Sequence, residues 1–467
     1  MIKNLSANAL QLVLNQLFGL IIFYVLSASL DKNSFGQINL ALAVLLAAFN
    51  ILSLGIDQLI IKRIASGEHV QKTLSLYIIH VLISGTFFYG LLLLAKIVFP
   101  QTGYTYHIIL LIAIGKLMIY LSLPFKQVAS GMERFKLLAY MSVISNFIRC
   151  ICLLVFALLH SIAVHTIIII FIVGDVAELL VCIYLYKRCI ETNLIIQWDK
   201  INYIKLLRET IPQSGVVVIT SALARFDWIF IGFVLSAVKL AEYSFAYKVF
   251  ELSTLPLLAI APLLIPYFTK LFKQQDKQLP NLKSLIRIEI VIAVLTALLL
   301  NICWSPIIDW ATSGKYGAVN AKTIFILSLC MPLLYVNNFL WTIYFAQGRL
   351  KMILSSFIIT LIANVAGDLL LIPYYKNEGA AFAFLLACLA QTLFYLKMNQ
   401  IAELKTIWQS LIICTGCALC SGLIVKFLFS NNCLTLLFSC LIYIALLLLT
   451  NQIRSTDRLF FRELSNS

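Results

Sequence analysis

The chain has 467 residues, of which 62% are hydrophobic and only 12% are charged, and its net charge is +15. This composition excludes a water-soluble globular protein, because about a quarter of the residues of such a protein are charged. Apolar runs of about 20 residues, each long enough to cross a hydrocarbon core of about 30 Å, recur along the chain. They lack the alternation that a transmembrane β-barrel needs. We therefore predict an all-α polytopic membrane protein.

Fourteen apolar runs qualify as membrane-spanning helices, and Pro124 marks the end of the fourth because proline removes a helical hydrogen bond. No loop between them is long enough to form a soluble domain. In chain order the spans are expected at residues 8–30, 36–61, 73–98, 104–125, 137–159, 166–187, 210–237, 243–269, 284–308, 323–346, 352–373, 380–398, 406–428 and 433–451.

Lys and Arg residues collect in alternate loops, 24 in one set and 7 in the other. Because cytoplasmic loops of membrane proteins are enriched in Lys and Arg, this asymmetry predicts that both termini lie in the cytoplasm. Loops that face anionic lipid headgroups then account for the positive net charge, so membrane lipids are the expected partners and nucleic acid is not.

A weak internal repeat relates the two halves of the chain. The sequence VLSA occurs at 25–28 and again at 234–237, and the glycines that follow spans four and ten are Gly131 and Gly348. Both matches are six spans apart, so the two copies have the same orientation and are related by an axis along the membrane normal. We predict a six-helix lobe over residues 1–205, a second over 206–400, and two further helices with a cytoplasmic tail over 401–467.

The sequence contains no recognisable metal or cofactor site. The twelve cysteines lie almost entirely in apolar runs and are interpreted as small hydrophobic residues. Cys414, Cys417 and Cys420 have no histidine or acidic residue nearby that would complete a metal site. Glycine-rich nucleotide motifs and HExxH are also missing from the sequence. We expect no metal, no cofactor and no catalytic residue.

Polar stripes occur on several spans at helical spacing. Asn15 lies in such a stripe on the first span, and Asn50 and Asp57 share one face of the second if that span is continuous over 36–61. Two interpretations remain open. These side chains either form hydrogen bonds between helices or line a water-filled cavity.

We select eight ionisable side chains inside predicted spans, where a charge costs about 2.5–3.5 kcal/mol on insertion scales. Lys248 and Glu251 are three residues apart on a helix and are expected to pair. Asp175 and Glu178 also share a face, so we expect either that one of them is protonated or that a cation such as Arg149 lies close to them. The four cations are Lys116, Arg149, Arg225 and Lys248, and the four acids are Asp175, Glu178, Asp227 and Glu251.

Two interpretations of these charges also remain open. The equal numbers are compatible with four buried ion pairs that hold helices together. Alternatively, the cations line a central cavity and bind an anionic group of a cargo, for which the planar guanidinium of arginine suits phosphate. In the second case the acids serve as counter-charges or as carriers of protons for coupling. Arg225 and Asp227 are two residues apart and point to nearly opposite faces, so they cannot satisfy each other.

Short motifs across nearly the whole chain resemble those of the bacterial polysaccharide and O-antigen repeat-unit flippases (Wzx type) of the multidrug/oligosaccharidyl-lipid/polysaccharide (MOP) superfamily. The motifs are SFGQI at 34–38, GMERFK at 131–136, RFD at 225–227, EYS at 242–244, GKY at 314–316 and GAA at 379–381. The resemblance implies two lobes around a central cavity, with cationic side chains such as Arg225 and Arg149 inside it.

The resemblance also implies a function. An undecaprenyl-diphosphate-linked oligosaccharide, for O-antigen or capsule, is expected to move from the cytoplasmic to the periplasmic leaflet of the bacterial inner membrane by alternating access. Polymerase and chain-length proteins of the same pathway are implied partners. Alternatives are a cation-coupled multidrug antiporter or a peptidoglycan-precursor flippase of the same fold and, among enzymes, a membrane polysaccharide polymerase. A polymerase normally has a long periplasmic loop, which this sequence lacks, so we do not expect an enzyme.

Overall fold

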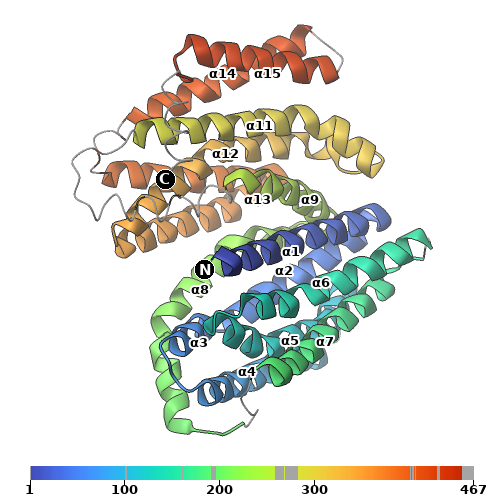
Figure 1. The fold of residues 1–467 in the computed structure, drawn as a ribbon. Helices are drawn as coiled ribbons and strands as arrows, with labels where there is room; N and C mark the ends of the chain where they lie inside the picture. The colour runs from blue at the N-terminus through green and yellow to red at the C-terminus, as the bar shows by residue number, and fades with distance from the viewer. Residues whose placement is uncertain are drawn as a thin grey trace. The chain divides into compact units, whose positions relative to one another are not determined.

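The structure, a computed structural model, is built from helices alone over the residues it describes (Figure 1). Ten helices of this part of the chain are long and apolar enough to cross a membrane. Contacts between Cα atoms divide the chain into two compact units, residues 1–241 and 242–467. The described residues are 2–99, 103–159, 161–190, 196–257, 264, 268, 282–399, 401, 404, 406–428 and 432–454.

The first unit contains eight complete helices, and α5 packs along both α6 and α7 within it. These three helices carry four of the eight selected charged residues. The unit comprises α1 (Ile2–Ser29), α2 (Lys32–Leu52), α3 (Ile56–Ala65), α4 (Val70–Val98), α5 (Tyr104–Gly131), α6 (Phe135–Leu158), α7 (Val164–Cys189), α8 (Lys200–Val234) and the start of α9 (Ala237–Ser253).

The second unit is organised around α12, which packs against α11 on one side and α13 on another, while α11 also contacts α14 and α15 (Figure 1). The predicted span over 243–269 lies partly outside the described residues, as does most of the predicted tail. The helices of this unit are the rest of α9, α11 (Leu282–Thr312), α12 (Gly317–Ala346), α13 (Leu350–Met398), α14 (Ile407–Leu428) and α15 (Asn432–Leu449).

The second predicted span is not continuous, and this part of the prediction is wrong. The helix ends at Leu52, and the chain turns through Leu54 (φ 52°) and Gly55 (φ 73°) before α3 begins. A glycine is favoured here for two reasons: the backbone is left-handed, and a β-carbon would overlap the side chain of Gln213 on α8. Asp57 consequently lies in the first turn of α3, so it does not share a helix face with Asn50.

The single glycine of the SFGQI motif, Gly36, has a packing role. A β-carbon on Gly36 of α2 would overlap the backbone carbonyl oxygen of Ala237, so the two segments approach at backbone distance. The preceding Asp31 caps α2, because its side chain accepts a hydrogen bond from the Ser34 amide at 3.0 Å. The motif therefore starts a helix and lets another segment pack closely against it.

Predicted spans eleven and twelve are distinct, although they follow each other within α13. The backbone leaves helical geometry at Lys376 (φ 54°, ψ −127°), between the two predicted ranges. Gly379, three residues later, packs against the Leu371 carbonyl so closely that a β-carbon would overlap it. The GAA motif at 379–381 therefore supports a tight reversal between two spans.

Polar side chains join helices inside the second unit. Asn301 Nδ2 of α11 donates to Ser328 Oγ of α12 at 2.6 Å. Asn337 of α12 accepts at Oδ1 from the Thr392 hydroxyl of α13 at 2.8 Å. Such hydrogen bonds commonly stabilise the association of transmembrane helices, and small residues at the interface allow the helices to approach closely. These four side chains therefore form hydrogen bonds between helices.

Candidate functional site

Five charged side chains form a cluster inside the first unit, between α5, α6 and α7. Lys116 and Lys126 come from α5, Arg149 from α6, and Asp175 and Glu178 from α7. Asp175 is fully buried, and the Lys116 side chain, the most exposed of the five, is only 18% exposed. With three cations and two acids, the cluster has one positive charge in excess. We refer to these five residues as the cationic cluster.

Asp175 is the centre of the cationic cluster. It forms an ion pair with the Arg149 guanidinium and accepts a hydrogen bond from Ser145 Oγ at 3.0 Å. Lys116 Nζ lies 3.9 Å from its other oxygen, Oδ2, which is an ion-pair distance but too long for a hydrogen bond. The Arg149 guanidinium also lies 4.7 Å above the centre of the Phe171 ring. The prediction that Arg149 sits close to the acids of α7 is confirmed.

Two glycines make room for this arrangement. A β-carbon on Gly115, the neighbour of Lys116, would lie 2.6 Å from Asp175 Oδ2. A β-carbon on Gly174 would lie 2.9 Å from the Arg149 side chain. Both distances are shorter than a van der Waals contact, so any other residue at either position would displace the buried ion pair.

Glu178, one turn after Asp175 on α7, has a different partner. It pairs with Lys126, and Ser122 Oγ donates to its Oε1 at 3.4 Å. The sequence analysis placed Lys126 in a cytoplasmic loop because Pro124 was taken as the end of the span. The helix instead continues through Pro124 to Gly131. Lys126 is therefore a member of the cluster that sequence reasoning missed.

Arg225 and Asp227 of α8 do not pair with each other among the described residues, as predicted. The Arg225 guanidinium lies 4.6 Å above the Trp228 ring, and its Nη1 donates to the Ala224 carbonyl at 3.0 Å. No ion pair of the described residues includes Arg225. Asp227 is buried and accepts from the Trp228 backbone amide at 2.8 Å. Arg225 is therefore a half-buried cation within an apolar span, held by an aromatic ring.

Lys248 and Glu251 of α9 form an ion pair with 2.7 Å between Nζ and Oε2. The predicted pairing is confirmed. Both side chains are partly exposed, so the pair contributes only weakly to stability.

The three polar residues predicted to line a cavity have different environments. Asn15 Oδ1 of α1 accepts a hydrogen bond from Asn146 Nδ2 of α6 at 3.0 Å, so it joins two helices. Asn50 is exposed near the end of α2. Asp57 Oδ1 is buried without a hydrogen-bond partner among the described residues.

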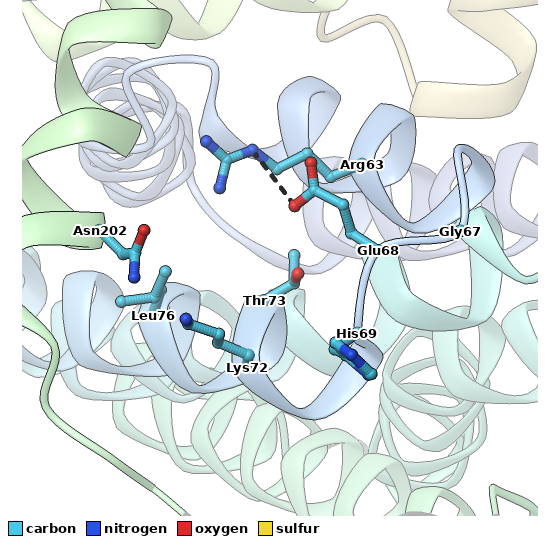
Figure 2. Close-up of a pocket in the computed structure, with 8 residues that line it drawn as sticks. All are labelled: Arg63, Gly67, Glu68, His69, Lys72, Thr73, Leu76 and Asn202. Atoms are coloured by element: carbon cyan, nitrogen blue, oxygen red, sulfur yellow. Dashed lines mark ion pairs between the residues drawn. The ribbon is translucent and has the colours of Figure 1, made fainter.

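A surface recess of about 200 Å³ lies where α3, α4 and the start of α8 meet, and sequence reasoning did not identify it (Figure 2). Arg63 at the end of α3 pairs with Glu209 of α8 at 2.6 Å and, more weakly, with Glu68 at 3.9 Å. Lys72 lies 3.7 Å from Asp199. The hydrogen bond from Arg63 is the largest cause that lowers the pKa of Glu209. The lining residues are Arg63, Gly67, Glu68, His69, Lys72, Thr73, Leu76 and Asn202.

Comparison with known proteins decides the family. The profile of the polysaccharide biosynthesis protein family matches residues 1–272, which is more than half of the chain. The chain belongs to this family. The family resemblance drawn from the short motifs is thereby confirmed. No curated protein sequence matches the chain.

Several solved structures share the fold of this family member. The lipid II flippase MurJ in an inward closed conformation has a TM-score of 0.76 at 14% identity, over 98% of this chain and 99% of its own. An inward-facing MATE family multidrug resistance transporter of the MOP superfamily has a TM-score of 0.64 at 14% identity, over 86% and 98%. A MOP superfamily transporter from Pyrococcus furiosus has 0.58 at 12%, over 87% and 94%.

These similarities establish the fold alone, since the identities are low. The all-α polytopic membrane fold predicted from the sequence is confirmed, and it is similar to the folds of MurJ and of a MATE transporter. Together with the apolar helices, the comparisons show a multi-pass membrane protein. The role of the cationic cluster and of Arg225 stays a prediction.

Proposed function

We propose that this protein is a flippase that moves an undecaprenyl-diphosphate-linked oligosaccharide repeat unit, for O-antigen or capsule, across the bacterial inner membrane. The cargo enters from the cytoplasmic leaflet and leaves to the periplasmic leaflet by alternating access, and both chain termini lie in the cytoplasm. Membership of the polysaccharide biosynthesis protein family supports this proposal. So does a fold similar over nearly its whole length to that of a lipid II flippase.

The observation that carries the proposal is the excess of positive charge buried among apolar helices. The cationic cluster has three cations for two acids, and Arg225 adds a further cation without an acidic partner among the described residues. A diphosphate brings about two negative charges, whose desolvation must be compensated inside a membrane. Cations that a carboxylate has not already neutralised are the groups able to compensate it.

Arg225 is the cation best suited to meet the diphosphate. Its planar guanidinium has five donors in a fixed fork that matches phosphate oxygens, and only one donor bond, to Ala224, is formed inside the described part of the chain. Stacking on Trp228 holds the guanidinium without using its remaining donors. Lys116, 3.9 Å from Asp175, is the cluster cation held least tightly. Lys248, whose ion pair is partly exposed, is the third candidate.

No chemical bond of the cargo is broken in this process, so the protein is proposed to be a carrier and not an enzyme. Its proposed partners are membrane lipids and, within the same pathway, the polymerase and chain-length proteins that use the flipped repeat unit. The lobes predicted over residues 1–205 and 206–400 are proposed to move relative to each other during alternating access, with 401–467 as an appendage.

The test replaces Arg225 with alanine and with lysine and measures surface polysaccharide together with the amount of protein in the membrane. We expect Arg225→Ala to lose surface polysaccharide at a normal protein level and Arg225→Lys to restore part of it, because lysine keeps the charge but loses the fork. The same loss of polysaccharide with a parallel loss of protein would show that Arg225 is needed for folding and would refute the assignment.

Arg188→Ala is the matched control. Arg188 of α7 also stacks on an aromatic side chain of its own helix, Tyr184, with 5.9 Å between the guanidinium carbon and the ring centre. It lies at an exposed helix end and not within the apolar part of a span. We expect normal surface polysaccharide from this variant. A loss equal to that of Arg225→Ala would mean that the effect has nothing to do with the position of Arg225 in the membrane.

A peptidoglycan precursor is the second candidate cargo. The observation that favours it is the higher TM-score with the lipid II flippase MurJ than with the MATE transporters. Complementation of a strain depleted of its lipid II flippase tests it directly. Growth restored by this chain would support the second candidate, whereas normal expression without growth would leave the repeat unit as the cargo.

A further inference from the structure

Glu289 is a buried carboxylic acid in the middle of the second unit that the sequence analysis did not select. It lies on α11, inside a helix apolar enough to span a membrane, and is only 3% exposed. Neither oxygen of its side chain has a hydrogen-bond partner among the residues that the structure describes. Every acid of the cationic cluster, by contrast, has a cation and a serine hydroxyl as partners.

Arg287 does not compensate Glu289, although it is only two residues away. Two residues correspond to about 200° around a helix, so the two side chains leave α11 on nearly opposite sides. The Arg287 side chain is near the Cys414 thiol of α14. The Glu289 side chain is near the Tyr335 hydroxyl of α12.

The other two helices that pack on α11, α14 and α15, offer Glu289 no charged partner within the described residues. From α15, the Tyr443 hydroxyl donates to the Val291 carbonyl at 3.4 Å and is therefore engaged with the backbone of α11. From α14, the thiols of Cys414 and Cys417 are the titratable groups that are buried there. Among the described residues, no side chain of these helices therefore forms an ion pair or a hydrogen bond with the Glu289 carboxyl.

An ionised carboxylate in this environment is strongly disfavoured. Burying a charge without a partner costs far more than burying the neutral acid, and such groups respond by taking up a proton. An ionisable residue inside a membrane span that no partner compensates indicates a functional site, because nothing in the packing requires it. The neutral acid is therefore the form that fits the structure, and ionisation requires a conformation in which water reaches Glu289.

We propose that Glu289 is a proton-binding site that couples the movement of the cargo to the flow of protons. This inference rests on the proposed flippase function. A proton from the periplasm binds to a carboxylate oxygen, forming the O–H bond, and the neutral acid becomes buried as the protein changes conformation. The same O–H bond breaks when Glu289 opens to the cytoplasm, and the proton leaves to water. One proton enters and one leaves in each cycle.

The position of Glu289 along α11 fits release toward the cytoplasm. It is the eighth residue of the helix, about 10 Å along the axis from the first residue at 1.5 Å per residue. The start of α11 is the end that the distribution of Lys and Arg predicts to be cytoplasmic. The route from the carboxyl to that side is therefore the shorter of the two.

The protonation of Glu289 is tested by infrared spectroscopy of the purified full-length protein at neutral pH. We expect a carboxylic acid C=O band in the wild type and in Glu133→Gln, and loss of that band in Glu289→Gln. Glu133 is an exposed acid in the turn between α5 and α6, so it serves as the matched control. If Glu289→Gln instead removes only carboxylate bands, the residue is ionised and the proposal is overturned.

The coupling is tested in proteoliposomes with a fluorescent undecaprenyl-diphosphate-linked N-acetylglucosamine as the probe and with the membrane potential clamped at zero. For one proton per cargo, a gradient of about one pH unit shifts the ratio of probe between the leaflets about tenfold. We expect this shift with the wild type and with Glu133→Gln. With Glu289→Gln the probe should still cross, but the ratio should not respond to the gradient.

The two proposals fail in different ways. If the probe crosses and Glu289→Gln responds to the gradient like the wild type, the coupling is overturned and the flippase function stands. If the wild type moves neither this probe nor the repeat unit of its host, the flippase function is overturned and the coupling with it. The infrared band then decides whether Glu289 binds a proton at all.

Discussion

Replacing Arg149 with alanine is expected to destabilise the first unit strongly, whatever part Arg149 has in transport. The substitution leaves Asp175 fully buried with one hydroxyl donor, Ser145, and with Lys116 Nζ at 3.9 Å as its nearest remaining cation. Asp175 cannot move to solvent because no part of its side chain is exposed. It must either remain ionised at a high cost or take up a proton.

The size of the effect follows from burial. Removing one partner of a buried ion pair costs about 3–5 kcal/mol, since it leaves an uncompensated charge. Loss of the contact between the guanidinium and the Phe171 ring adds about 1 kcal/mol. For a unit of this size a loss of 1 kcal/mol lowers the unfolding midpoint by about 2–4 °C, so we expect a decrease of about 10–20 °C.

The assay is thermal unfolding of the purified protein in detergent, run as a double-mutant cycle. Arg149→Met with Asp175→Asn removes both charges and leaves the excess of one positive charge in the cationic cluster unchanged. We expect this double variant to recover most of the stability that either single variant loses. Single variants that unfold at the wild-type temperature would refute the reasoning, because the pair would then contribute nothing to the fold.

Two further predictions concern neighbouring features. Gly115→Ala places a β-carbon 2.6 Å from Asp175 Oδ2 and should lower the free energy of unfolding by about 1–3 kcal/mol, whereas Gly90→Ala, with open space around it, should leave stability equal or higher. Equal unfolding temperatures for the two variants would contradict this. Glu209→Gln should lower the free energy of unfolding by at most about 1 kcal/mol at neutral pH, because the Glu209 side chain that pairs with Arg63 is partly exposed. The hydrogen bond from Arg63 lowers the pKa of Glu209, so the stabilisation from the pair is present above the ordinary glutamate pKa and is lost as pH falls through the lowered value. A difference in unfolding free energy between variant and wild type that persists in acid would contradict the assignment.

Hydrophobic length predicted the helices well, because a run of apolar residues in a bilayer has almost no alternative to a helix. It did not predict the break between α2 and α3. The residues from 51 to 56 are nearly all apolar, and Gly55, whose backbone is left-handed at the break, packs closely against Gln213. That contact joins residues more than 150 positions apart, and local sequence carries no signal for it.

The charged residues show the same division between local and distant information. The pairing of Lys248 with Glu251 follows from their spacing on one helix and was predictable. The pairing of Lys126 with Glu178 depends on how α5 lies against α7, and a proline seven residues before the helix end concealed it. Glu289 was missed for another reason. It is distinguished by the lack of a hydrogen-bond partner among the described residues, and the sequence alone does not show which side chains surround a buried residue.

A buried ion pair and a binding site for cargo are compatible roles for Arg149 if the acid can be exchanged for a phosphate. Arg149 Nε and Asp175 Oδ2 have no hydrogen-bond partners among the described residues, so the pair is not saturated. A diphosphate that displaces Asp175 from the guanidinium leaves that acid with Ser145 and Lys116, which are already beside it. The exchange then substitutes one anion for another at the same cation, and Lys116, now 3.9 Å from Asp175, is the cation that remains for the displaced acid. The excess positive charge of the cationic cluster favours this exchange, because it compensates one of the roughly two negative charges that the diphosphate brings.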